Sequence, residues 1–255
     1  MMKPFSERNR VCLEKGKLAI GYLLAGYPDR DDFLDILSSC EVAGLDVFEI
    51  GYPSMEPVGD GEVIRNAHKA SDISLQTDLS YWEKIRNTVE IPIWVMAYKK
   101  DLIDSGFYKL LAQNGLADAF VIPDASFEHR LALLEELRPF GIDVLGFVTP
   151  DTENDEQEAC FNAFPLIYQQ LYSGPTGMSV ETKDYEEILA RAKEHRDVRV
   201  FAGFGITSAK RATQLLNSGF DGIIVGTAMI SKLNISKEEL TSFVQDLHGT
   251  VSKGR

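Results

Sequence analysis

The sequence predicts an α/β fold, a (β/α)8 TIM barrel that uses residues 1–255 as a single domain. Three observations predict it. Short apolar runs alternate with helical patterns along the whole chain. Eight such runs are present, whereas the alternative, a doubly wound sheet, would usually use fewer strands in a chain of this length. No low-complexity linker or break in composition divides the sequence.

Each predicted strand is a short apolar run between segments that favour helices or turns. In chain order, the strands are residues 18–24, 47–50, 91–97, 119–122, 144–148, 166–170, 198–202 and 222–225. Between them, apolar residues recur at helical spacing, for example over residues 31–43, 102–114, 127–138, 184–195 and 208–218. Several of these helices end at a glycine suited to a C-cap, namely Gly44, Gly115 and Gly219.

The composition argues against several classes of partner. Its 26 basic and 39 acidic residues give a net charge of −13, which repels nucleic acid and anionic membranes. No apolar run approaches the ~20 residues of a membrane helix, and the first residues lack the apolar core of a signal peptide. We therefore expect a soluble, cytoplasmic protein. The three cysteines are far apart, as reduced thiols would be.

Two carboxylates fall where a barrel carries its active site, at the carboxyl ends of the strands. Glu49 stands at the end of the second predicted strand, and Asp60 follows in a loop stiffened by prolines and glycines. Paired acids suit proton transfer because different surroundings can separate their pKa values. The structural alternative is that Glu49 pairs with a cation and Asp60 caps a helix beginning near Glu62.

Three glycine-bearing segments predict a phosphate site. They are residues 173–177, 203–208 and 226–228, after the last three predicted strands. Barrels often bind phosphate with these loops and a short extra helix, for which residues 227–232 are long enough. Glycines let backbone N–H groups approach the anion without help from Lys or Arg. We therefore expect a phosphorylated small-molecule substrate.

Other polar and aromatic residues have simpler interpretations. Lys99 and Lys100 follow the third strand and could form a Schiff base, but adjacent lysines are more often solvated. Asp124 is expected to cap the following helix, and the acidic residues 151–158 to form an exposed helix start. Tyr52 either closes the site or packs on the barrel rim. The histidines share no spacing, so we expect surface positions and no metal site: His68, His129, His195 and His248.

Seven stretches, in their order and spacing, resemble the tryptophan synthase α subunit family over nearly the whole chain. They are Gly-Tyr-Leu-Leu-Ala-Gly-Tyr-Pro at 21–28, Phe-Glu-Ile-Gly-Tyr-Pro at 48–53, Pro-Val-Gly-Asp-Gly at 57–61, Val-Ile-Pro-Asp at 121–124, Gly-Pro-Thr-Gly at 174–177, Gly-Phe-Gly-Ile at 203–206 and Val-Gly-Thr-Ala at 225–228.

This resemblance implies a lyase of tryptophan biosynthesis that splits indole-3-glycerol phosphate into indole and glyceraldehyde 3-phosphate by retro-aldol cleavage. It implies no cofactor or metal, and a tryptophan synthase β subunit as partner in an α2β2 complex. Glu49 would be the general acid/base that protonates C3 of the indole, and Asp60 would bind the indole N–H. The other implied residues are Tyr22, Tyr168 and Thr176 for substrate, and Gly177, Gly205, Gly226 and Thr227 for phosphate.

The chain departs from the family pattern in the loops at 54–62 and 98–101. The family usually has Pro-Phe-Ser-Asp-Pro at 53–57 and an Asn-rich segment after the third strand. Two alternative functions are therefore kept. One is a related barrel aldolase that acts on a different phosphorylated substrate. The other is a non-catalytic barrel that activates a partner, against which the presence of both Glu49 and Asp60 argues.

Overall fold

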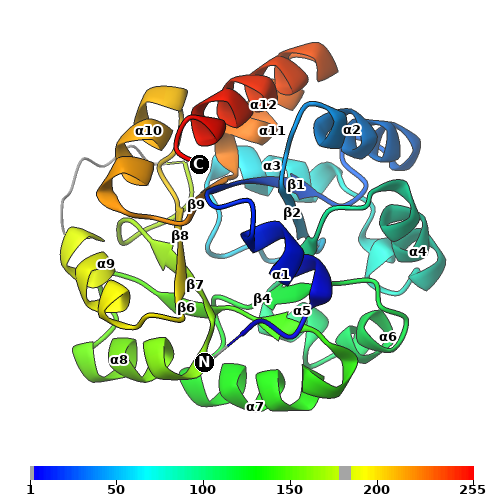
Figure 1. Cartoon of the computed structure of the whole chain (residues 1–255). Helices are drawn as coiled ribbons and strands as arrows, with labels where there is room; N and C mark the ends of the chain where they lie inside the picture. The colour runs from blue at the N-terminus through cyan, green and yellow to red at the C-terminus, as the bar shows by residue number, and fades with distance from the viewer. Residues whose placement is uncertain (1–2, 178–184) are drawn as a thin grey trace.

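The computed structural model describes residues 3–177 and 185–255, and these form a barrel of parallel strands surrounded by helices (Figure 1). Every strand pair is parallel, and the strands follow the order β5-β4-β3-β2-β1-β9-β8-β7-β6. Their bounds are β1 Leu18–Leu24, β2 Val47–Gly51, β3 Ile93–Met96, β4 Ala119–Val121, β5 Asp143–Val144, β6 Gly146–Val148, β7 Leu166–Gln170, β8 Arg199–Gly203 and β9 Gly222–Val225. The predicted (β/α)8 fold class is confirmed.

The barrel closes within one interrupted strand. The sequence predicted a continuous strand over residues 144–148, but the structure divides it at Leu145 into β5 and β6. The first part pairs with β4 and the second with β7, so the two ends of the strand order are covalently joined. The interruption marks the point where the strand changes from one neighbour to the other.

The helices lie outside the strands, as Figure 1 shows. Their bounds are α1 Glu7–Leu13, α2 Arg30–Val42, α3 Glu62–Ala70, α4 Leu79–Thr88, α5 Lys99–Leu102, α6 Phe107–Gln113, α7 Phe127–Leu137, α8 Asn154–Ala163, α9 Tyr185–Glu194, α10 Ala209–Ser218, α11 Thr227–Leu233 and α12 Lys237–Ser252, with 3-10 turns η1 Ile73–Gln76 and η2 Arg138–Phe140. None of the described helices is long and apolar enough to cross a membrane.

One predicted helix was wrong in extent. The helix predicted over residues 102–114 is α6, which begins only at Phe107, because Leu102 ends α5 and the turn between them includes Gly106 with φ +79°. Such a conformation is open to glycine and breaks a helix. The predicted C-terminal glycines Gly44, Gly115 and Gly219 have φ of +102°, +63° and +113°, as a helix end of this type requires. Residue 184, the predicted start of another helix, lies outside the described residues.

Side chains alternate between the barrel interior and the helical layer, as strand geometry dictates. The interior holds a packed cluster that includes Leu18, Ile20, Val47, Trp94 and Phe201. The outward side chains join a larger cluster with the helices. This cluster fills the middle of the barrel. The space open to a ligand therefore lies near the carboxyl ends of the strands.

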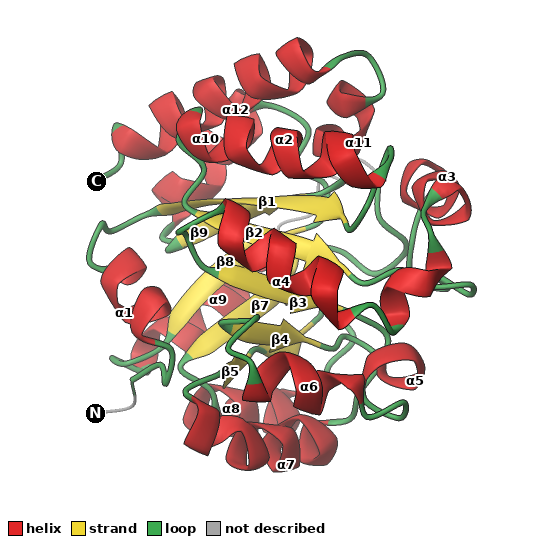
Figure 2. Ribbon diagram, turned by 90° about the vertical axis from the view of Figure 1, so that its right-hand side faces the viewer, coloured by secondary structure: helices red, strands yellow, loops and turns green. Residues whose placement is uncertain are grey.

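Helix α1 covers the opposite end of the barrel, where the strands begin (Figure 2). Its buried Asn9 donates through Nδ2 to Asp143 Oδ2 at 2.8 Å and accepts at Oδ1 from Trp94 Nε1 at 2.9 Å. Ser6, the N-cap of α1, donates through Oγ to Asp118 Oδ1 at 2.8 Å. Polar contacts with strand residues therefore hold α1 across the barrel floor.

Candidate active site

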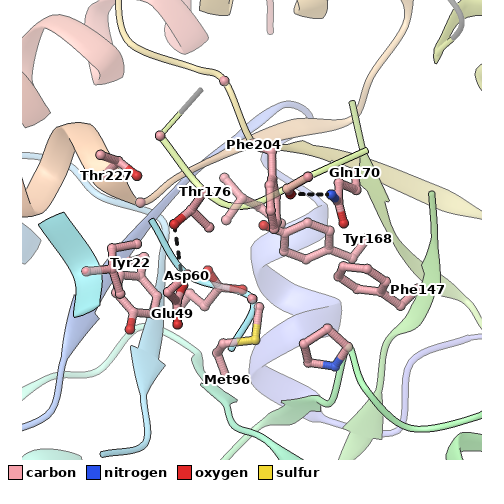
Figure 3. A pocket seen from close by; sticks show the side chains of 18 of the residues that line it. Tyr22, Glu49, Asp60, Met96, Phe147, Tyr168, Gln170, Thr176, Phe204 and Thr227 are labelled. Carbon is pink, nitrogen blue, oxygen red and sulfur yellow. Dashed lines mark hydrogen bonds between the residues drawn. The ribbon is translucent and has the colours of Figure 1, made fainter. Parts of the chain in front are cut away.

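A cavity of about 300 Å³ lies at the carboxyl ends of the strands (Figure 3). Its wall comes from loops far apart in the sequence. All nine of the residues singled out from the sequence line it: Tyr22, Glu49, Asp60, Tyr168, Thr176, Gly177, Gly205, Gly226 and Thr227. The fold therefore brings the predicted acids, substrate residues and phosphate residues to one place.

Glu49 is a buried acid in the wall of this cavity. It lies on β2, is 2% exposed, and its Oε1 has no hydrogen-bond partner among the described residues. Burial raises the pKa of Glu49 from 4.5 to about 8, and the negative charge of Asp60 adds to the effect. The expected alternative, an ion pair with a cation, is absent from the described part of the chain. Glu49 therefore carries its proton at neutral pH.

Asp60 differs from Glu49 because it has hydrogen-bond donors. Its Oδ2 accepts from the Tyr98 hydroxyl at 2.8 Å, and its Oδ1 faces Thr176 Oγ1 at 3.5 Å. Burial raises the pKa of Asp60, and these two hydrogen bonds oppose that rise. The N-cap of α3 is Gly61, which makes no side-chain cap, so the alternative role of Asp60 as a cap is wrong.

The loops after β2 and β7 meet over the two acids. The Gly61 N–H donates to Thr176 Oγ1 at 2.7 Å, and the Thr176 N–H donates to the Gly59 carbonyl at 3.3 Å. The Gln170 side chain, at the end of β7, donates to two carbonyl groups of the second loop. These contacts place Thr176 over the acids and shield them from solvent.

The predicted phosphate residues gather at one side of the cavity. A Cβ at Gly177 would lie 3.2 Å from Thr227 Cγ2, so the loop after β7 touches the first residue of α11. Gly177 and Gly205 have φ of +85° and +71°. Within residues 3–177 and 185–255, no Lys or Arg lines the cavity. Backbone N–H groups and the Thr227 hydroxyl are what an anion would meet here.

The other side of the cavity is aromatic. The Tyr168 ring stacks on Phe147, with centroids 4.9 Å apart and 28° between planes, and meets Phe204 edge-on at 6.2 Å (Figure 3). Phe204 has φ +73°, an unusual conformation for a bulky residue, and stands between two glycines. Tyr22 is buried across the cavity from these rings, beside Gly226, and burial raises the pKa of its hydroxyl (Figure 3). These rings form apolar walls suited to a planar ring.

The comparison with known families decides where the chain belongs. The family model described as tryptophan synthase alpha chain matches residues 9–253. The chain belongs to this family. The resemblance stated from the seven sequence stretches is therefore confirmed.

Individual tryptophan synthase relatives agree over most of their length. The tryptophan synthase alpha chain of Bacillus licheniformis is 31% identical over 237 residues, 89% of this chain and 87% of the relative. That of Thermoanaerobacter sp. is 30% identical and covers 92% of this chain and 94% of the relative. A structure of Mycobacterium tuberculosis tryptophan synthase superimposes with a TM-score of 0.83 at 26% identity, covering 96% of this chain and 98% of that chain.

Two residues at this family site were not assigned a role from the sequence. Tyr98, in the loop at 98–101, donates to the Asp60 carboxylate. The expectation of a surface position for His68 was wrong, because its side chain is 3% exposed and lines the cavity. The helical spacing of Ile64, Ala67 and His68, which are the buried residues of α3, could have placed it on an inward face.

Asp124 follows strand β4, and Lys99 and Lys100 follow strand β3. Asp124 does not cap the following helix, since Ser126 is the N-cap of α7. Asp124 instead accepts from the backbone N–H of Lys99 at 2.9 Å. Neither Lys99 nor Lys100 lines the cavity. Their amines bind Asp104 and Glu56, at 2.5 Å and 2.8 Å.

The positions of Tyr52 and of the acidic residues in α8 bear on two further predictions. Tyr52 lines the cavity, but it is 1% exposed and stacks on Trp82, so it is packed in the wall rather than closing the site as a lid. Asp155 and Glu156 lie exposed in the first turn of α8, as the acidic run predicted. Among the described residues, no group of three His, Cys, Asp or Glu side chains is placed to hold a metal ion.

Proposed function

We propose that this chain cleaves indole-3-glycerol phosphate to indole and glyceraldehyde 3-phosphate, as a lyase of tryptophan biosynthesis. The observation that carries the proposal is the pair of acids in one cavity. Glu49 is buried and its Oε1 has no hydrogen-bond partner among the described residues, whereas Asp60 is held by donors. The aromatic walls accept the indole, and the glycine-rich side accepts the phosphate.

In the proposed reaction the substrate gains a proton at C3 of the indole and loses a proton from a glycerol hydroxyl. Glu49, protonated at neutral pH, gives its proton to C3 of the indole, which leaves a positive charge on the ring nitrogen. Asp60 accepts a hydrogen bond from that N–H and stabilises the charge. The Glu49 carboxylate then takes the proton of the hydroxyl on the adjacent glycerol carbon. The bond between this carbon and C3 breaks, its electrons return to the ring, and an aldehyde forms.

The remaining proposed residues hold the substrate in place. Tyr22 and Tyr168 contact the substrate from the barrel interior, and Thr176 covers it from the loop after β7. The backbone at Gly177 and Gly205, with the α11 N-terminus, binds the phosphate. Because no Lys or Arg is among the described residues that line the cavity, binding depends on how closely the backbone N–H groups of these loops approach the anion.

The proposed setting follows the family. We propose a tryptophan synthase β subunit as partner, since the superimposed Mycobacterium tuberculosis structure is of tryptophan synthase. We also propose that residues 1–255 act as a single barrel domain in the cytoplasm, without cofactor or metal.

The test is indole release from indole-3-glycerol phosphate by the purified chain, alone and with a tryptophan synthase β subunit. Release in either case supports the proposal, and dependence on the partner identifies an α subunit. Glu49→Gln should lower turnover by about 100-fold or more. Glu128→Gln, an exposed change of the same kind on α7, should not. Absence of indole in both cases would overturn the proposal and point to a different phosphorylated substrate.

A further inference from the structure

His68 lies beside Asp60, and the mechanism proposed above gives it no role. It is part of the buried face of α3, and its side chain is 3% exposed. A histidine inside an apolar core needs partners for both ring nitrogens. The partners of the two nitrogens indicate the role of His68.

The first partner fixes the tautomer of His68. Its Nδ1 accepts the backbone N–H of Ser54 at 3.0 Å. Burial lowers the pKa of the imidazole to about 4, against a smaller opposing effect of Asp101, so the ring is neutral at physiological pH. With Nδ1 acting as an acceptor, the single ring proton must be on Nε2.

The second partner is the carboxylate of Asp60. Nε2 of His68 lies 3.7 Å from Asp60 Oδ2, the same oxygen that accepts from Tyr98. This separation is longer than a hydrogen bond, but contacts of this kind often shorten when substrate fills a site. The imidazole also links two parts of one loop, because Ser54 is near its start and Asp60 near its end.

We propose that His68 is a positioning residue, whose Nε2–H donates to Asp60 in the substrate complex and holds that carboxylate ionised and directed at the substrate ring N–H. The inference rests on the proposed function, in which Asp60 receives that N–H. A donor to a carboxylate favours its ionised form. Loss of the donor should therefore raise the pKa of Asp60.

Other groups also act on the Asp60 carboxyl: hydrogen bonds from Tyr98 and Thr176 and the charge of Arg65 lower its pKa, and none of them is altered by a substitution at His68. Tyr98 stays protonated, because burial raises its pKa. Arg65 also binds the Asp60 carbonyl, at 2.8 Å. Glu49 loses its proton only near pH 8. His68 is neutral above about pH 4, so its own titration does not change activity there. We therefore expect the fall in activity at low pH, the acid limb of the pH profile, to follow the protonation of Asp60.

Two substitutions test the roles of the two ring nitrogens of His68 separately. In His68→Asn the amide oxygen can replace Nδ1 as acceptor for Ser54, but no donor reaches Asp60. In His68→Gln the amide nitrogen can replace Nε2 as donor, while the contact with Ser54 is lost. His129→Asn, on the exposed face of α7, is the matched control.

The kinetic test measures kcat and KM for indole-3-glycerol phosphate against pH. We expect His68→Asn to lower kcat about tenfold and to move the acid limb to higher pH, as loss of one hydrogen bond to a charge would. His68→Gln should keep the acid limb and most of kcat, with a lower melting temperature. Wild-type kinetics in His68→Asn, or an equal loss of kcat in His68→Gln, would overturn the inference.

A second measurement does not need turnover. The Asp60 carboxyl can be titrated by carbon-13 NMR in the free chain, where the Nε2–H dipole of His68 already acts on Asp60 Oδ2 from 3.7 Å, with Asp60→Asn to assign its signal. We expect a higher pKa for Asp60 in His68→Asn than in the wild type and little change in His68→Gln. If the wild type released no indole, the proposed function would fail, and this titration would still decide the role of His68. The same Asp60 pKa in all three chains would overturn it.

Discussion

Glu49 should make the fold less stable as pH rises, and Glu49→Gln should remove that effect. The carboxyl titrates at about 8 in the folded chain, against an ordinary value of 4.5. Each pKa unit is worth about 1.4 kcal/mol, so ionised Glu49 costs the fold on the order of 5 kcal/mol. Between these two pH values the folded chain holds a proton that the unfolded chain has released. The stability of the protonated form is fully present below 4.5 and is lost as pH rises to about 8.

The glutamine variant has no such proton to lose. Its free energy of unfolding should exceed that of the wild type by an increasing margin as pH rises, and this margin should level off above pH 8. Urea unfolding of both chains at about pH 5 and about pH 9 measures the margin, and other titrating groups cancel in the comparison. If the two chains showed the same pH dependence, Glu49 would not be a buried, unpartnered acid.

Three further predictions concern activity and packing. Because the reaction requires protonated Glu49 and ionised Asp60, kcat/KM should fall above pH 8, and a profile still rising at about pH 9 would contradict this. Gly177→Ala should raise KM about tenfold, measured with indole-3-glycerol phosphate, because the added Cβ meets Thr227 at 3.2 Å in a backbone with φ +85°. Gly203→Ala should lower the free energy of unfolding by about 1–3 kcal/mol in urea titrations, since its Cβ would lie 2.2 Å from an aromatic ring. An unchanged KM for the first variant, or an unchanged urea midpoint for the second, would show that the loop or ring moves aside.

Much of the barrel could be predicted because its strands are buried apolar runs between clear turn signals. Strands β1, β7 and β9 begin and end at the predicted residues. Parallel strands in a barrel must all end at one mouth, so strand-end residues such as Glu49 could be placed together from the sequence alone. The interruption at Leu145 could not, because it depends on which neighbour each half of the strand pairs with.

The parts of the site that were missed depend on contacts between loops. Asp124 follows a strand and precedes a helix, which is a common position for a cap, but Ser126 stands closer to the first turn of α7. The carboxylate of Asp124 is therefore free to reach Lys99 in the neighbouring loop. His68 was judged by its lack of metal-ligand spacing, whereas its burial follows from the face of α3 that it shares with Ile64.

Helix α1 precedes in the chain the two aspartates that hold it on the barrel floor. Asn9 and Ser6 bind Asp143 and Asp118, which lie 134 and 112 residues further along the chain. During synthesis, the N-terminal segment must therefore wait, exposed and without these partners, until more than half of the protein has left the ribosome. Its docking seals the barrel floor. Deletions within α1 should thus leave the β1–β2 and β2–β3 pairs unaffected and act on the later closure of the barrel floor.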